Sequence, residues 1–115
     1  MSEHSSTEKV YIAGPMSGID NYNAPAFYTG EEYMISMGIP GKNIFNPIRS
    51  EMSIRVQEGE FMGQEAYRKC MQEDLNWICE HATMMYMLQD WENSKGARAE
   101  HATALCLGLR IIYQA

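Results

Sequence analysis

The segment Ala82 to Leu88 (ATMMYML) restricts the fold more than any other, because it is apolar almost throughout. A short run without polar alternation is typical of a strand that is covered on both faces. Three other short runs rich in strand-forming residues accompany it, at Lys9 to Ala13, Asn43 to Asn46 and Leu109 to Tyr113. We therefore expect a sheet whose central part is buried by helices on both faces.

Three helical patterns separate these strands. The first has Pro25 in its first turn and is ended by Gly38, and the other two show apolar residues at helical spacing. They cover about residues 24–37, 64–80 and 95–107. Strands that alternate with helices favour a parallel sheet with right-handed crossovers.

The segment Ile48 to Gly63 shows no clear period, so we expect a long loop there, of the kind that often covers a site. A chain of 115 residues has room for one domain. We predict a flexible N-terminal segment over residues 1–8 and one α/β domain over residues 9–115. This domain is expected to be Rossmann-like (flavodoxin-like), with a parallel sheet of four or five strands and helices on both faces. Ligands of such folds bind at the carboxyl ends of the strands.

The formal net charge of −6 makes general binding to nucleic acid or to an acidic membrane unfavourable. No apolar stretch approaches the roughly 18 residues that a membrane-spanning helix needs. Residues 1–8 are polar and lack the apolar part of a secretory signal, so we expect a cytoplasmic location. Cys70, Cys79 and Cys106 have no CxxC spacing; they suggest buried thiols rather than a disulfide framework or a zinc site.

Two carboxylates fall on apolar helix faces. Asp74 lies three residues after Met71 and four before Ile78, and Glu100 lies on a face of small residues between Ala97 and Ala104. Two buried carboxylates can serve as nucleophile and acid in the cleavage of a glycosidic bond. The structural alternative for each is a partly solvated residue at the edge of a helical face.

Two segments could bind an anion. The loop from Gly14 to Gly18 follows a strand, and Ser94, Lys95 and Gly96 open a helix, where free backbone N–H groups favour a phosphate. Neither segment has the spacing of an established phosphate-binding motif. Ser94 is explained equally well as an N-cap.

Four motifs in this order resemble those of the nucleoside 2-deoxyribosyltransferase superfamily. They are YIAGPMSG at Tyr11 to Gly18, FNP at Phe45 to Pro47, the aspartate of DLNWI at Asp74, and SKGARAE at Ser94 to Glu100. The resemblance extends over about residues 9–113. The superfamily includes the 2'-deoxynucleoside 5'-monophosphate N-glycosidases and many short phage and bacterial proteins of unassigned role.

The resemblance implies a catalytic role for three residues. Glu100 would be the carboxylate that attacks the anomeric carbon or assists water, Asp74 would handle the leaving base and its protons, and Tyr11 would orient Glu100. Without the resemblance, Tyr11 would be taken as a core aromatic residue of a strand. The substrate-binding residues that the motifs imply are Gly14, Pro15, Met16, Ser17, Gly18, Asn46, Ser94 and Gly96.

Ser94 departs from the pattern of the transferases, which usually carry an aspartate at this position, whereas the monophosphate hydrolases carry a serine. A carboxylate would repel a 5'-phosphate, while a hydroxyl at a helix N-terminus can donate to it. Sites of the superfamily are often completed by a C-terminal residue of a neighbouring subunit. A homo-oligomer, dimer or larger, is therefore expected.

The predicted function is hydrolysis of the N-glycosidic bond of a 2'-deoxynucleoside 5'-monophosphate to free base and deoxyribose 5-phosphate. Two alternatives remain, namely base exchange between deoxynucleosides and a non-catalytic protein that sequesters a nucleotide. We expect no metal or organic cofactor and, for a phage-encoded chain, a location in the host cytoplasm. The sequence does not identify the base, for whose recognition Trp91 and the segment from Ile48 to Gly63 are candidates.

Overall fold

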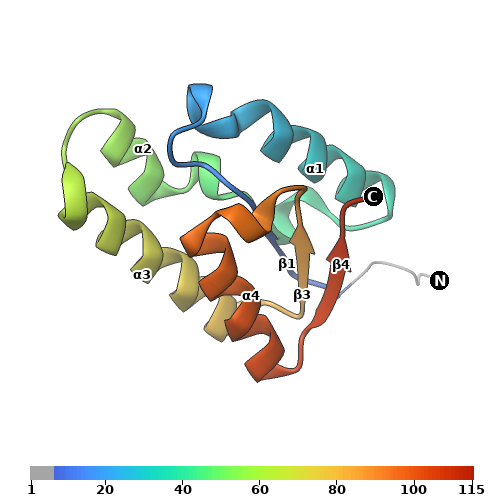
Figure 1. Cartoon of the computed structure of the whole chain (residues 1–115). Coiled ribbons are helices and arrows are strands. Elements are labelled where there is room, and N and C mark those ends of the chain that lie inside the picture. Colours follow the sequence, from blue (N-terminus) through green and yellow to red (C-terminus); the bar gives the residue numbers. More distant parts are fainter. Residues whose placement is uncertain (1–6) are drawn as a thin grey trace.

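The computed structural model describes residues 7–115, so most of the predicted flexible segment 1–8 lies outside the described part. Of that segment Glu8 is described, and its carboxylate accepts a hydrogen bond from the hydroxyl of Thr83. The strands and helices follow each other in the order β1 (Val10–Ala13), α1 (Ala24–Ser36), β2 (Ile44–Phe45), α2 (Glu51–Gln57), α3 (Gly63–His81), β3 (Met84–Met87), α4 (Lys95–Leu107) and β4 (Arg110–Tyr113) (Figure 1).

All four strands are parallel and lie in the order β2-β1-β3-β4. Tyr11 in β1 pairs with Phe45 of β2 on one side and with Met85 of β3 on the other. The chain therefore moves from β1 outward to β2 and then returns to the opposite side of β1. This strand order is that of the flavodoxin-like folds, and it places the topological switch point between β1 and β3. The predicted α/β fold with a four-stranded parallel sheet is confirmed.

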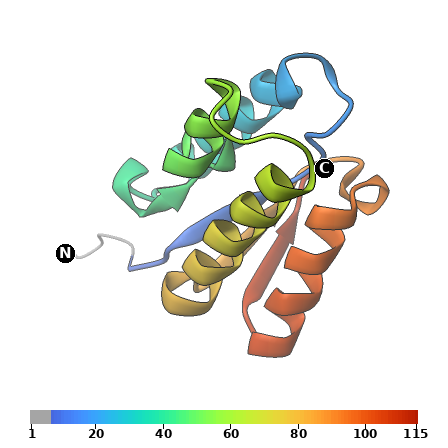
Figure 2. The same cartoon turned by 90° about the vertical axis from the view of Figure 1, so that its left-hand side faces the viewer.

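Helices cover both faces of the sheet, as predicted. The side chains of β1 alternate, so that Val10 and Ile12 belong to a cluster with Phe27 and Met34 of α1. Tyr11 and Ala13 point to the other face, where the cluster includes Ile78 of α3 and both Ala97 and Ala104 of α4. Figure 2 shows α3 and α4 side by side on this second face. Every residue of β1 and β3 is buried, which explains the apolar run that the sequence shows there.

The prediction of a loop over Ile48 to Gly63 is wrong, because this segment contains α2. Ser50 is the N-cap of this helix, and its hydroxyl accepts a hydrogen bond from the N–H of Ser53 at 3.2 Å. Seven residues are only two helical turns, which is too short for an apolar period to become visible in the sequence. The helix packs against α3, and this tertiary contact supports it.

Two of the three cysteines are not buried as expected: Cys79 and Cys106 are exposed, and Cys70 is partly buried. Both exposed thiols lie on the outer faces of the helices that cover the sheet. Among the helices of residues 7–115, none is long and apolar enough to cross a membrane.

Candidate active site

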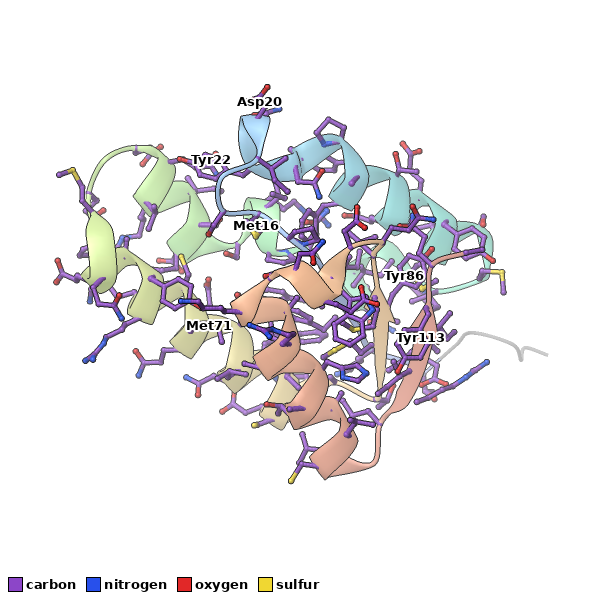
Figure 3. All side chains as sticks on the ribbon, viewed as in Figure 1. Met16, Asp20, Tyr22, Met71, Tyr86 and Tyr113 are labelled. Atoms are coloured by element: carbon purple, nitrogen blue, oxygen red, sulfur yellow. The ribbon has the colours of Figure 1, made fainter. Side chains whose placement is uncertain are left out.

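A cavity of about 610 Å³ opens at the carboxyl ends of β1 and β3, at the topological switch point of the sheet. Its volume lies in the range of small-molecule sites in proteins. The loop after β1 and the start of α4 form part of its wall, and residues of α2 and α3 complete it. Met16 and Tyr22 lie on the side of the β1 loop, and Met71 lies on the side of α3 (Figure 3).

Tyr11 and Glu100 form a buried hydrogen bond at the base of this cavity. The Tyr11 hydroxyl donates to Oε2 of Glu100 over 2.8 Å. β1 directs Tyr11 toward α4 because alternate side chains of a strand point to opposite faces. The Tyr11 ring stacks on Phe45, with ring centres 5.3 Å apart, so the hydroxyl is held by packing as well as by its acceptor.

Asp74 joins this pair from α3. Its side chain lies one helical turn before the buried Ile78, so the same helix face that packs on the sheet carries the carboxylate into the cavity wall. Asp74 and Glu100 are 8% and 5% exposed, which excludes the alternative of solvated residues at the edge of a helical face. Among residues 7–115, no three His, Cys, Asp or Glu side chains lie together so that they could hold a metal ion.

The burial of these groups changes their titration. The pKa of Asp74 is raised to about 7: burial is the main cause and the nearby charge of Glu73 adds to it, while hydrogen bonding with Tyr11 and Glu100 acts in the opposite direction. Burial and the charge of Asp74 raise the pKa of Glu100 well above its ordinary value, while the hydrogen bond from Tyr11 lowers it. Burial also raises the pKa of Tyr11, so the phenol keeps its proton. The two carboxyls therefore titrate as a pair that retains a proton near neutral pH.

The start of α4 forms one end of the cavity. Ser94 is its N-cap, and its hydroxyl oxygen accepts a hydrogen bond from the N–H of Ala97 at 3.1 Å. The N–H groups of Lys95 and Gly96 have no acceptor among the described residues, as is usual for the first turn of a helix. A Cβ at Gly96 would lie 3.5 Å from the sulfur of Met71, so the glycine leaves this end of the cavity open.

The loop after β1 contributes Gly14, Pro15, Met16 and Ser17 to the cavity wall. Gly14 is required by close packing, because a Cβ there would lie 2.9 Å from the Cβ of Leu88. The absence of that side chain lets the loop leave β1 directly beside the end of β3. Gly18 has a φ of 78° and turns the chain, but it does not line the cavity.

Comparison with known protein families matches residues 8–113 to the family described as "Domain of unknown function (DUF4406)". The chain belongs to this family. The match covers every strand and helix of the DUF4406 domain, from β1 to β4. No curated protein and no solved structure gives a significant match to the chain.

The structure brings together most of the site residues that the sequence predicts for this DUF4406 domain, but neither Gly18 nor Asn46 lines the cavity. The side-chain nitrogen of Asn46 donates to the Glu31 carboxylate at 3.0 Å, and its oxygen accepts from the N–H of Ile48 at 3.0 Å. Asn46 is buried and does not line the cavity. Its amide therefore fixes the turn after β2 against α1, which is a structural task.

Sequence reasoning missed the wall that α2 and the first turns of α3 provide. Ser53, Val56 and Gln57 lie on one face of α2, at spacings of three and four residues, and all three line the cavity. The available signal was the Ser50 N-cap that precedes them. The remaining lining residues outside the predicted catalytic and substrate-binding sets are Tyr22, Pro47, Gly63, Gln64, Ala66, Tyr67, Cys70, Met71, Asn93, Lys95 and Ala97.

Trp91 is not part of this cavity. Its ring packs on His101, with ring centres 4.2 Å apart, and His101 is hydrogen-bonded to the Tyr113 hydroxyl at 2.7 Å. In the DUF4406 domain, Trp91 packs against the core cluster on the α3–α4 face of the sheet, and Tyr113 belongs to the edge strand β4. Base recognition by Trp91 has no support in this arrangement.

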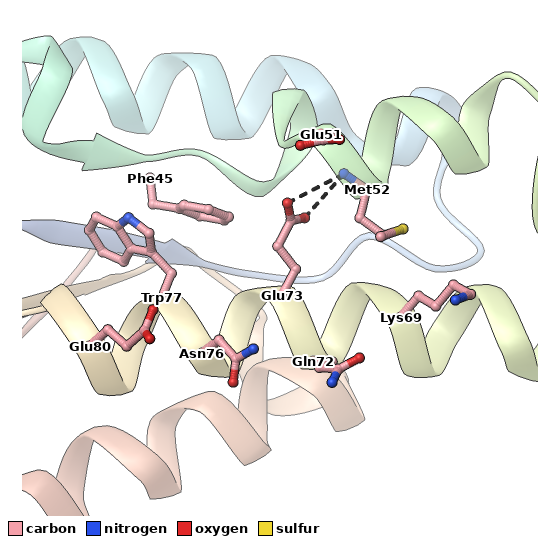
Figure 4. Close-up of a pocket in the computed structure, with 9 residues that line it drawn as sticks. All are labelled: Phe45, Glu51, Met52, Lys69, Gln72, Glu73, Asn76, Trp77 and Glu80. Carbon is pink, nitrogen blue, oxygen red and sulfur yellow. Dashed lines mark hydrogen bonds between the residues drawn. The ribbon is translucent and has the colours of Figure 1, made fainter.

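A second, more open cavity of about 410 Å³ lies between α2 and α3 (Figure 4). Across it, the Glu73 carboxylate accepts hydrogen bonds from the N–H of Met52, at 3.3 and 3.4 Å. This contact ties the first turn of α2 to the middle of α3. Glu73 therefore helps to hold the α2 wall of the candidate active site in place, one residue before Asp74.

Proposed function

We propose that this DUF4406 domain hydrolyses the N-glycosidic bond of a 2'-deoxynucleoside 5'-monophosphate, giving free base and deoxyribose 5-phosphate. The observation that carries the proposal is the buried Tyr11–Glu100 hydrogen bond beside Asp74, at the base of a cavity that also contains the start of α4. The resemblance of the motifs to the deoxyribosyltransferase superfamily supports the same chemistry.

In the first step, Glu100 is the nucleophile. Tyr11 holds Oε2, so Oε1 attacks C1' of the sugar, and the bond from C1' to the base nitrogen breaks. Protonated Asp74 donates its proton to the leaving base. The products of this step are the neutral base and a deoxyribosyl ester of Glu100.

In the second step, the Asp74 carboxylate takes a proton from a water molecule whose oxygen attacks C1'. The bond from C1' to Glu100 breaks, Glu100 regains its negative charge, and Asp74 is again protonated. The cycle needs one ionised and one protonated carboxyl. The raised pKa values of the pair favour a single shared proton, and the Tyr11 hydroxyl stabilises a negative charge on either carboxyl. The proposal assigns that charge to Glu100, which accepts the 2.8 Å hydrogen bond from Tyr11.

The 5'-phosphate is placed at the start of α4. Lys95 and Gly96 line this end of the cavity, their N–H groups have no acceptor in the described part of the chain, and the positive end of the helix dipole lies here. The Ser94 oxygen already accepts from Ala97, so its own hydrogen is available for a phosphate oxygen. Lys95 is a lining residue with a positive charge.

Incubation of the purified chain with a panel of deoxynucleoside monophosphates, followed by chromatography of the released base, tests the proposal. Glu100→Ala should retain the fold, because Ala suits a helix, and should lower base release by at least about a thousandfold. Glu80→Gln is the matched control, because it changes an exposed carboxylate of α3 outside the cavity. Turnover of Glu100→Ala within about tenfold of the unaltered chain would refute the assignment.

Two other outcomes identify the alternatives. Base exchange that is faster than hydrolysis, when a second free base is supplied, would indicate a transferase. Tight binding without any turnover would indicate a nucleotide-sequestering protein. The two buried carboxyls argue against the latter, because burial of acidic groups is unfavourable and a protein that only binds a nucleotide has no use for them.

A further inference from the structure

Ser53 carries a buried hydroxyl that the fold does not use. The residue is 6% exposed and lines the cavity, and its backbone N–H donates to Ser50 Oγ. The hydroxyl itself has no hydrogen-bond partner among residues 7–115. A buried polar group without a partner is unfavourable and rare, so its position in a cavity wall indicates a group that pairs with a ligand.

Gln57 lies one helical turn after Ser53 on the same face of α2 and also lines the cavity. Its side-chain nitrogen donates to the carbonyl oxygen of Ile48 at 3.1 Å. This bond determines the orientation of the amide, so the Gln57 side-chain oxygen is left as an acceptor without a partner in the described chain. The α2 wall thus presents one hydroxyl and, nearer the mouth, one carbonyl oxygen of defined orientation.

These two groups lie on a different side of the cavity from the start of α4. Both α2 and α4 pack against α3, and Figure 2 shows them on opposite sides of that helix. With the phosphate at α4 and C1' at Glu100, as the proposed function has them, the α2 side of the cavity is the part left for the base. Val56 and the buried Ala66 supply apolar surface next to Ser53 and Gln57.

We propose that Ser53 and Gln57 recognise the amidine edge of the base, that is, an exocyclic amino group beside an unprotonated ring nitrogen, as in cytosine and adenine. This inference rests on the proposed function. The Gln57 oxygen accepts from the amino group, and the Ser53 hydroxyl donates to the ring nitrogen. In uracil and hypoxanthine a carbonyl oxygen replaces the amino group and would face the Gln57 oxygen, which leaves two acceptors opposed.

The two residues have different tasks in this arrangement. The Ser53 hydroxyl can rotate and pair with a donor or an acceptor, so it aids binding of either kind of base. The Gln57 amide cannot rotate without losing its bond to Ile48, so discrimination depends on Gln57. We therefore expect the unaltered chain to prefer the amino base by about 10- to 100-fold.

The test uses pairs of monophosphates that differ only at this edge, namely deoxycytidine against deoxyuridine and deoxyadenosine against deoxyinosine. Base release by the unaltered chain gives the ratio of kcat/KM values for each pair. Binding of the same four nucleotides to Glu100→Gln, measured by calorimetry, gives the ratio of Kd values without turnover. The absence of base release with every nucleotide would refute the proposed function. The Kd ratios would still show whether the cavity prefers a base with the amidine edge.

Variants of α2 complete the experiment. In Gln57→Ala, the two members of each pair should differ by no more than about threefold in kcat/KM and in Kd. Ser53→Ala should lower kcat/KM about tenfold for all four nucleotides and leave the ratios within each pair unchanged. Glu58→Gln, an exposed neighbour outside the cavity, is the matched control. Ser53→Ala should be at least as stable as the unaltered chain, because its hydroxyl has no partner to lose. Equal Kd values within each pair for Glu100→Gln, or an unchanged ratio in Gln57→Ala, would overturn the inference.

Discussion

Replacement of Asp74 by Asn tests the buried acid pair without any substrate. In the folded chain, burial raises the pKa of Asp74 from the ordinary value of 3.8 to about 7. The unfolded chain has the ordinary value, so between these two pH values the folded state binds more protons than the unfolded state. The contribution of protonated Asp74 to stability is therefore fully present below about pH 4 and is lost as the pH rises through about 7.

The magnitude follows from the size of the pKa change. At about 1.4 kcal/mol for each pH unit, ionisation of Asp74 lowers the free energy of unfolding by about 4 kcal/mol at pH 8 and by less than half of that at pH 5. Asn has the same shape and does not ionise, so Asp74→Asn avoids this loss. The stability difference between variant and unaltered chain should widen in favour of the variant by roughly 2–3 kcal/mol from pH 5 to pH 8.

Thermal unfolding followed by circular dichroism between pH 5 and pH 8 measures this effect. For a chain of this size the widening corresponds to about 10 °C in Tm. Other groups titrate in both proteins, so the difference isolates Asp74 and the carboxyl coupled to it. Glu80→Gln is the control, because it removes an exposed carboxylate of the same helix that lies outside the buried pair. A Tm difference between Asp74→Asn and the unaltered chain that stays constant to within about 2 °C from pH 5 to pH 8 would refute the buried acid pair.

Three further substitutions address the other parts of the site. Tyr11→Phe keeps the ring stacked on Phe45 but removes the hydrogen bond that lowers the pKa of Glu100. Base release should therefore fall about 10- to 100-fold, and the acidic limb of the pH–rate profile should move to higher pH. Ser94→Asp keeps an N-cap but places a negative charge beside the phosphate, so kcat/KM for the monophosphate should fall at least about a hundredfold while the unphosphorylated nucleoside is spared. Gly14→Ala should lower the free energy of unfolding by about 1–3 kcal/mol in chemical denaturation, because its Cβ would lie 2.9 Å from the Cβ of Leu88.

Local patterns in the sequence were sufficient to predict the strands and three of the four α-helices. The apolar run around β3 predicts a covered central strand, and the alternation of strands and helices predicts the parallel sheet. The helical positions of Asp74 and Glu100 place both carboxylates on buried faces, as the structure confirms. These properties depend on residues within a few positions of each other, which is the range over which helical and strand periodicity acts.

The details of the site depend on contacts between distant segments, and no local pattern contains them. The Tyr11–Glu100 hydrogen bond joins residues 89 positions apart, and the Gln57 amide is oriented by a carbonyl outside its own helix. The amide in the FNP motif is turned to α1 and away from the cavity, because Glu31 and Ile48 satisfy it there.

The sequence by itself determined the order of the elements, the faces that they bury and the end of the sheet at which the cavity lies. Only the tertiary structure decided that α2 forms a wall of that cavity, that the Ser53 hydroxyl in it has no partner, and that two carboxyls share one buried environment. The physical reason is that burial and electrostatic coupling depend on every segment packed around a group. A pKa or an unpaired hydroxyl is therefore a property of the assembled fold and not of the residue that carries it.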